Sequence, residues 1–79
     1  MIEAQTLVDC VFKYNPKSDA DMIQAAYAYG KHTHEGQFRR SGEPYFSHPI
    51  EVAMILAQQK LDDSTIITAL LHDTIEDTG

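Results

Sequence analysis

Residues 62–79 read DDSTIITALLHDTIEDTG, and this stretch says most about the architecture of the chain. Its first three residues, Asp62 to Ser64, have side chains that can cap a helix N-terminus. The following two turns are almost entirely apolar and contain Ile66, Ile67, Ala69, Leu70 and Leu71. A helix that is apolar on nearly every side is buried. The stretch therefore predicts a central helix that leads into His72-Asp73.

Three more helical patterns precede this helix. The first covers about residues 2–13 and stops at Asn15-Pro16. The second begins at Ser18, which we expect to form a capping box with Asp21, and it continues to residue 34. The third begins at His48-Pro49, because proline is tolerated at the first helical position. Residues 35–44 form a polar loop, and no alternating strand pattern competes, so the predicted class is all-α.

Composition describes one small domain. Of 79 residues, 43% are hydrophobic and 23% are charged, which is too apolar for a disordered chain. A domain of this size buries only about 60 to 65% of its unfolded surface, so its stability should depend on a metal, a partner or a second copy. The single cysteine, Cys10, excludes an internal disulfide. The first residues do not resemble a signal peptide, and no apolar run is long enough to span a membrane, so we expect a cytoplasmic protein.

The charge pattern separates two kinds of anionic partner. The net charge of −6 argues against binding to a nucleic-acid polymer. Half of the six basic residues, however, fall within one ten-residue window, as Lys31, Arg39 and Arg40. A loop arginine presents a planar fork that matches phosphate oxygens, although two loop arginines are more often a solvated surface. The window favours a small phosphate ligand.

His72-Asp73 is the strongest candidate for chemistry. Two metal-binding residue types at the end of an apolar helix need a partner, and a divalent cation would serve. His48, at the start of the neighbouring helix, is the natural third ligand. Two imidazoles and a carboxylate suit Mn, Fe or Zn better than Ca. The alternative is that each histidine is a hydrogen-bonded core residue, which is the commoner role of a lone histidine.

Two further groups of residues have a functional and an ordinary interpretation. Glu76 and Asp77 lie about one turn after His72-Asp73. In the functional interpretation both carboxylates take part in the same site. In the ordinary one, Glu76 is a solvated surface residue and Asp77 caps a following helix. Five aromatic residues could stack on a base, but at this spacing we expect them to be core residues: Tyr27, Tyr29, Phe38, Tyr45 and Phe46.

Taken together, HEGQFRRSGEPYFSHP (residues 34–49) and LLHDTIEDT (residues 70–78) resemble the hydrolase domain of the RelA/SpoT homologue family. The resemblance covers nearly all of residues 27–79, with matching order, spacing and flanking apolar residues. It implies the N-terminal helices of an HD-domain phosphohydrolase fold. It also implies a manganese-dependent enzyme that removes pyrophosphate from the ribose 3′ oxygen of the guanine nucleotide (p)ppGpp, leaving GDP or GTP.

The resemblance also implies a role for each matching residue. The metal ligands would be His48, His72 and Asp73. The acidic pair that orients or deprotonates the attacking water would be Glu76 and Asp77. The loop that contacts the nucleotide would be Arg39, Arg40 and Ser41.

In the family the domain continues past Gly79 and supplies a further aspartate to the metal, so residues 1–79 are expected to be a partial HD-type domain with weakened metal affinity. Three interpretations follow. The first is a (p)ppGpp hydrolase whose activity needs more than this chain. The second is a non-catalytic module that forms a homo-oligomer or pairs with a complementing chain, because a central helix without its cover exposes apolar surface. The third is an HD phosphohydrolase for another nucleotide.

Overall fold

The computed structural model describes the backbone of residues 1–78 and the side chains of residues 1–72. It contains four helices: α1 (Ala4–Tyr14), α2 (Ala20–Thr33), α3 (Ser47–Gln58) and α4 (Asp63–Thr78). Within the described backbone, the only extended pairing is an isolated antiparallel bridge between Phe38 and Pro44 in the loop from α2 to α3. The predicted all-α class is confirmed.

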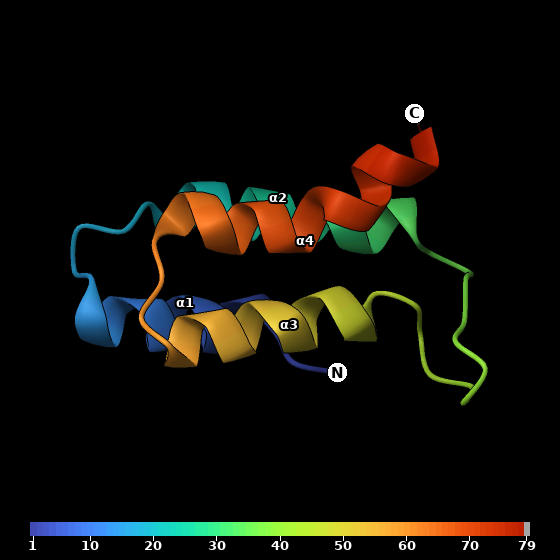
Figure 1. Ribbon diagram of the computed structural model, residues 1–79, viewed down its shortest axis with the longest axis horizontal. Coiled ribbons are helices and arrows are strands. Elements are labelled where there is room, and N and C mark those ends of the chain that lie inside the picture. Colours follow the sequence, from blue (N-terminus) through green and yellow to red (C-terminus); the bar gives the residue numbers. More distant parts are fainter. Residues whose placement is uncertain (79) are drawn as a thin grey trace.

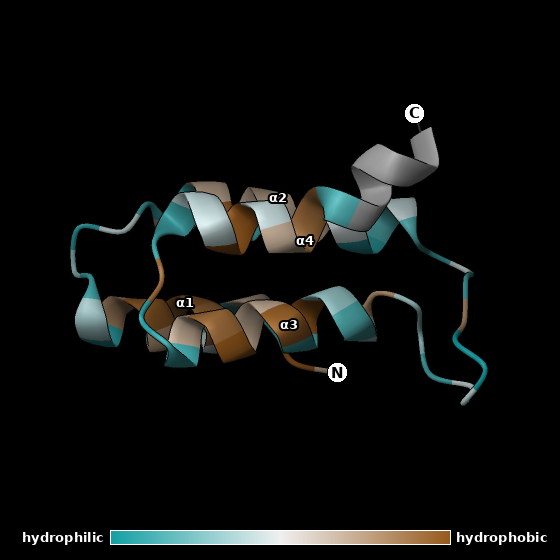
Figure 2. Ribbon diagram, viewed as in Figure 1, coloured by the Kyte–Doolittle hydropathy of each residue, from teal (hydrophilic) through white to brown (hydrophobic). Residues whose placement is uncertain are grey.

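The helices form two layers, with α1 beside α3 and α2 beside α4 (Figure 1). Helix α4 packs against α2 and α3, and α1 packs against the same two helices. Neighbours within each layer run in the same direction, so α2 and α4 both end where α3 begins (Figure 1). Figure 2 shows that the segments between α1 and α2 and between α2 and α3 are mostly hydrophilic, while apolar residues concentrate on the helices.

The core confirms a central position for α4. Ile66 and Leu70 are at most 1% exposed, and they pack in one cluster with Leu7, Ile23 and Ile50 from the other three helices. Ile67 and Leu71 are only partly buried. The part of α4 whose side chains are described, residues 63–72, is therefore buried along one face and half-buried on its flank, and not enclosed on all sides. No helix in the described backbone has the length and apolar character needed to cross a membrane.

Gly30 allows a close approach between α2 and its neighbours. A Cβ atom built at this position would lie 2.5 Å from Cε1 of Phe46 and 2.9 Å from the carbonyl oxygen of Leu70. Only a residue without a side chain fits between an aromatic ring and a backbone oxygen at these distances. Gly30 therefore brings the end of α2, the start of α3 and the second half of α4 together.

The N-terminus of α2 differs from the prediction. The cap is Asp19, whose carboxylate accepts a hydrogen bond from the backbone N–H of Met22 at 3.1 Å, so the predicted capping box of Ser18 and Asp21 is wrong. The Ser18 hydroxyl instead donates to Oδ1 of Asp63 at 2.7 Å, and the backbone N–H of Asp19 donates to Oδ2 at 2.9 Å. A carboxylate from the start of α4 takes up the donors of this loop, which leaves Asp19 to cap the helix.

The other helix starts are close to the predictions. Asp62, one of the three predicted cap residues, accepts from the backbone N–H of Thr65 at 3.0 Å. Helix α3 begins at Ser47, one residue before the predicted start, and no side chain caps it.

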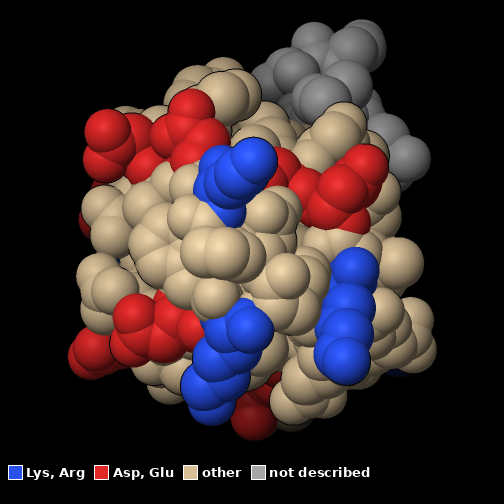
Figure 3. All heavy atoms as spheres, turned by 90° about the vertical axis from the view of Figure 1, so that its left-hand side faces the viewer, with Lys and Arg blue, Asp and Glu red and all other residues tan. Residues whose placement is uncertain are grey.

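The end of the bundle that carries the α1–α2 and α3–α4 connections shows acidic and basic side chains interspersed over its surface (Figure 3).

Candidate functional site

The predicted site residues that the structure describes lie at one end of the bundle. The loop between α2 and α3 forms this end, and His48 stands in the first turn of α3. The second half of α4, which carries His72, lies over the same end (Figure 1). These elements pack closely at Gly30, where there is no room for a Cβ atom between the backbone of α2, Phe46 and Leu70. The topology alone therefore brings residues 39–48 and residue 72 to a common region.

His72 is partly buried, and one of its ring nitrogens is fixed by the helix backbone. Nδ1 lies 3.0 Å from the carbonyl oxygen of Ala69. A carbonyl oxygen only accepts hydrogen bonds, so this contact requires the proton on Nδ1, and in the neutral form of the ring the lone pair then lies on Nε2. Histidines that bind metals commonly have this arrangement, because the hydrogen bond fixes both the tautomer and the ring orientation. His72 thus fits the requirements of a metal ligand that binds through Nε2.

His48 is the second residue of α3, and its side chain is exposed. Its backbone N–H donates to the carbonyl oxygen of Tyr45 at 3.2 Å, which ties the first turn of α3 to the loop. The alternative of a hydrogen-bonded core histidine does not hold for this residue, because the side chain is not in the core. An exposed imidazole at a helix start is accessible to a metal ion or a ligand.

Asp73, Glu76 and Asp77 belong to the last turns of α4, but their side chains lie outside the described residues. Among the side chains that are described, no group of three or more His, Cys, Asp or Glu residues could hold a metal ion. The described part of the predicted set is His48 and His72. The three-ligand metal site and the acidic pair remain predictions.

The loop closes on itself at Arg39 and Glu43. The backbone N–H of Arg39 donates to the carbonyl oxygen of Glu43 at 2.8 Å, and the N–H of Gly42 donates back to Arg39 at 2.9 Å. Gly42 has a φ of 91°, a conformation that suits glycine. The turn leaves Arg40 and Ser41 exposed at the tip. Two of the three predicted nucleotide-contacting residues are therefore accessible without any rearrangement of the loop.

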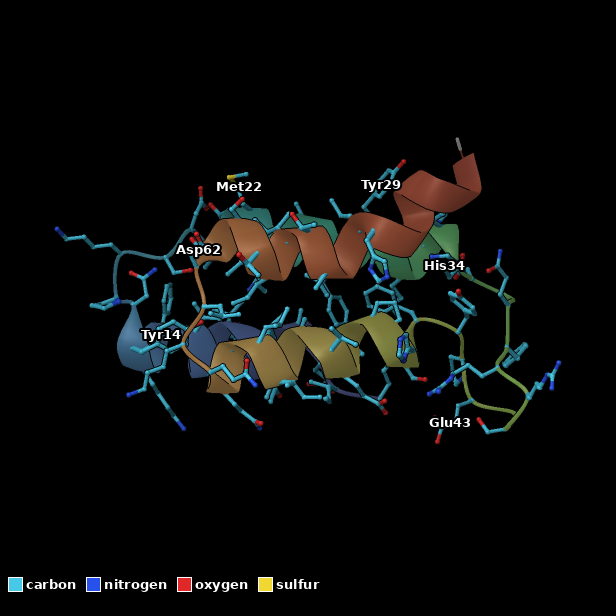
Figure 4. The ribbon with its side chains drawn as sticks, in the orientation of Figure 1. Tyr14, Met22, Tyr29, His34, Glu43 and Asp62 are labelled. Carbon is cyan, nitrogen blue, oxygen red and sulfur yellow. The ribbon has the colours of Figure 1, made fainter. Side chains whose placement is uncertain are left out.

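Arg39 is the member of this group with charged partners. Its Nη1 lies 3.6 Å from Oε2 of Glu43 and 3.8 Å from Oε2 of Glu51 on α3. The hydroxyl of Ser47 also donates to Oε2 of Glu43, at 3.4 Å. These contacts connect the loop tip to the first turns of α3. Figure 4 shows Glu43 on the α3 side of this end and His34 on the α2 side.

His34 has a structural role that sequence reasoning missed. Its side chain is only 3% exposed, and its ring lies against Tyr45 with a centroid distance of 4.6 Å. Nδ1 lies 2.9 Å from Oε1 of Gln37, and the backbone N–H of Tyr45 donates to the carbonyl oxygen of Gln37 at 2.9 Å. His34 thus contacts both the beginning of the loop, at Gln37, and its end, at Tyr45. The sequence pattern does not predict this role, because nothing in the spacing signals a contact with Tyr45.

The aromatic residues divide between core and surface. Tyr27 and Phe46 are buried, as predicted, and Tyr45 is partly buried. Tyr29 and Phe38 are 59% and 65% exposed, so the core prediction is wrong for both. Phe38 borders a pocket of about 190 Å³ beside the end of α2. Pockets that enclose a small ligand usually measure about 300 to 1,000 Å³, so this hollow alone is too small for a whole nucleotide.

Comparison with known proteins gives a family. A model of the HD domain matches residues 15–79. A GTP pyrophosphokinase of Myxococcus xanthus is 57% identical over 68 residues, which are 86% of this chain and 9% of that protein. The GTP pyrophosphokinase rsh of Brucella melitensis is 50% identical over 78 residues, 99% of this chain and 10% of that protein.

A third relative carries both activities in its name. The bifunctional (p)ppGpp synthase/hydrolase RelA of Mycobacterium tuberculosis is 50% identical over 64 residues, 81% of this chain and 9% of that protein. The chain thus spans about a tenth of the length of these relatives. Since the family model covers most of the chain, the protein belongs to the HD domain family, as the HD domain of RelA/SpoT proteins.

Proposed function

We propose that this chain carries the metal-binding and nucleotide-binding end of a (p)ppGpp 3′-pyrophosphohydrolase. The reaction would add water to the pyrophosphate group on the ribose 3′ oxygen and release GDP or GTP. The observation that carries the proposal is the gathering of His48, His72 and the arginine loop at one end of the bundle. The name of the RelA relative, which includes (p)ppGpp hydrolase, supports the choice of substrate.

HD domains generally depend on a divalent metal ion, and manganese is the one we propose here. Its ligands would be His48, His72 and Asp73. The hydrogen bond from Nδ1 of His72 to Ala69 supports this assignment, because it directs the lone pair of the ring to Nε2. A divalent ion bound there would lower the pKa of a water molecule and offset negative charge on the pyrophosphate.

The remaining roles belong to side chains of the chain itself. Glu76 and Asp77 follow His72 on α4 by about one turn, and we assign them to the orientation and deprotonation of the attacking water. Arg39, Arg40 and Ser41 would bind the phosphate groups, since a guanidinium pairs with two phosphate oxygens at once. Lys31, at the end of α2, adds a third positive charge at this end of the bundle. These cations offset the repulsion between an acidic protein and a highly charged nucleotide.

The direct test is release of pyrophosphate from ppGpp by the purified chain in the presence of Mn²⁺. Asp73→Ala and Glu76→Ala should each abolish release, because one removes a proposed metal ligand and the other the proposed base. Asp21→Ala serves as the control, because this exposed carboxylate lies in the first turn of α2 at the opposite end of the bundle. Turnover of another nucleotide with ppGpp left intact would assign the chain to a different HD phosphohydrolase.

Absence of turnover at every metal concentration would favour a non-catalytic module. Two measurements then separate its forms. Light scattering reports self-association, for which the exposed side chains of Met22 and Tyr29 and the half-buried Ile67 provide apolar surface. Recovery of activity on addition of the corresponding downstream segment of a longer relative would identify a complementing chain.

A further inference from the structure

Glu51 is a charged residue at the site end of α3 that the proposed reaction does not use. It lies three residues after His48, so the two side chains are neighbours on one face of the helix. Its side chain is 53% exposed, and its Oε2 lies 3.8 Å from Nη1 of Arg39. A residue from the helix that carries a proposed metal ligand therefore contacts a residue from the proposed nucleotide loop.

The contacts of Arg39 are arranged on one side of its guanidinium group. Both ion pairs, to Glu43 at 3.6 Å and to Glu51 at 3.8 Å, are made by Nη1. These distances are longer than charge-assisted hydrogen bonds, which measure about 2.7 to 2.9 Å. The carboxylates therefore restrain the arginine without holding it tightly. Nη2 and Nε carry a second pair of N–H donors, and a phosphate group can accept from this pair in a planar fork.

The two glutamates restrain Arg39 from different elements. Glu43 belongs to the same closed turn as Arg39 and would move together with the loop. Glu51 belongs to α3, whose position is set by buried residues such as Ile50 and Ala53. Among the described side chains, Glu51 is the residue of α3 whose carboxylate pairs directly with the guanidinium of Arg39, whereas Glu43 reaches α3 through the hydroxyl of Ser47. Arg40, at the loop tip, makes no ion pair among the described side chains.

We propose that Glu51 is a positioning residue that holds Arg39 beside the first turn of α3, so that the arginine meets a phosphate group close to His48. This role rests on the proposed function, because it concerns the same nucleotide site. The positioning role also explains why a negatively charged residue, Glu51, lies at a site proposed to bind phosphate groups. By charge alone, Glu51 would repel the ligand, and its removal would tighten binding.

Positioning of Arg39 by Glu51 and repulsion of the ligand by Glu51 predict opposite changes in ppGpp affinity when Glu51 is removed, so the affinity distinguishes them. The affinity of the full chain for ppGpp is measured by calorimetry with Mn²⁺ present, for the unchanged chain, Glu51→Ala and Glu35→Ala. Glu35 is the matched control, because it is an exposed glutamate at the same end of the bundle that pairs with His32 and not with Arg39. Glu51→Ala should weaken binding by about three-fold, the size expected for an exposed ion pair. Glu35→Ala should leave binding unchanged or tighten it.

A double-mutant cycle identifies the partner through which Glu51 acts. In an Arg39→Ala background, Glu51→Ala should cause no further loss, whereas in an Arg40→Ala background the full loss should remain. Glu51→Gln, which keeps an oxygen that can accept from the guanidinium, should recover part of the affinity. Equal or tighter binding by Glu51→Ala than by the unchanged chain would overturn the proposal.

A measurement without nucleotide separates this inference from the proposed function. The NMR signal of the Arg39 Nε–H group, assigned with Arg39→Lys, reports the order of the side chain. Order should fall in Glu51→Ala and stay unchanged in Glu35→Ala, while circular dichroism shows that both variants are folded. If the unchanged chain fails to bind ppGpp, the proposed function fails for this chain, and the NMR result still judges the positioning role. Unchanged Arg39 order in Glu51→Ala would overturn it.

Discussion

The ring of Phe46 meets the ring of Tyr27 edge to face, with centroids 5.1 Å apart and planes at 89°. Phe46 immediately precedes α3, and Tyr27 lies in the middle of α2. Such aromatic pairs contribute about 0.5 to 1.5 kcal/mol beyond the burial of their area. The pair fixes where α3 begins and thereby where His48 stands relative to α2. Substitution of Gly30, which lies against Phe46, tests how strictly this junction is packed.

Gly30→Ala should destabilise the protein by about 1 to 3 kcal/mol, because the new Cβ would overlap Phe46 and the Leu70 carbonyl oxygen. Helix propensity alone predicts the opposite sign, since alanine is favoured over glycine by about 1 kcal/mol within a helix. Urea unfolding measures the change. Ala28→Gly, at an exposed position of the same helix, gives the propensity effect without the clash. A more stable Gly30→Ala variant would contradict the close packing.

Tyr27→Phe should cost about 0.5 to 1.5 kcal/mol at neutral pH, because it removes the hydrogen bond from the tyrosine hydroxyl to the carbonyl oxygen of Ile2 at 2.6 Å and keeps the ring. Burial, with a smaller effect from the charge of Glu3, raises the pKa of Tyr27 above its ordinary value of 10.0. The stability that follows from this shift is complete below pH 10.0 and is lost as pH rises through the higher folded-state pKa.

Unfolding measured between pH 8 and pH 11 should therefore show a smaller loss of stability in Tyr27→Phe than in the unchanged chain. Part of the alkaline loss should remain, because burial also raises the pKa of Tyr14, whose hydroxyl donates to the Leu61 carbonyl oxygen. Identical pH profiles for the two proteins would show that Tyr27 does not ionise with a shifted pKa.

Asp19→Ala and Asp21→Ala should separate the observed cap of α2 from the predicted one. Loss of a capping aspartate costs about 0.5 to 2 kcal/mol, so Asp19→Ala should be clearly destabilising. Asp21 lies in the first turn, where a carboxylate interacts only with the helix dipole, and its loss should cost about 0.3 to 1 kcal/mol. Thermal unfolding of both variants gives the comparison. A larger loss of stability in Asp21→Ala than in Asp19→Ala would support the predicted capping box of Ser18 and Asp21 instead.

The cap of α2 shows where sequence reasoning reached its limit. The spacing of Ser18 and Asp21 predicts a helix start at this point, but the residue that caps the helix is Asp19. The choice is made by Asp63, which lies 45 residues from Ser18 in sequence and accepts a hydrogen bond from the Ser18 hydroxyl. Contacts of this kind depend on the packed arrangement of helices, which a local pattern does not contain.

The same limit applies to the site. Four helices and the loop of residues 35–44 followed from apolar periodicity and from residues that stop helices, because these signals are local. The partners of Arg39 and the contact between His34 and Tyr45 join segments on either side of the loop. The spacing of the aromatic residues predicts a core position for Tyr29 and Phe38, yet both side chains are exposed. Residue type predicted which groups are present, and topology determined their neighbours.

Addition of Mn²⁺ should raise the melting temperature of the chain if His48 and His72 share an ion. A ligand that binds only the folded state stabilises it by RT ln(1 + [L]/Kd), so the shift should grow with metal concentration. His72→Ala and His48→Ala should each abolish the shift. His32→Ala is the control, because this histidine is exposed and pairs with Glu35. An equal shift in all three variants would mean that the metal stabilises the chain through other groups, and the assignment of His48 and His72 as ligands would fail.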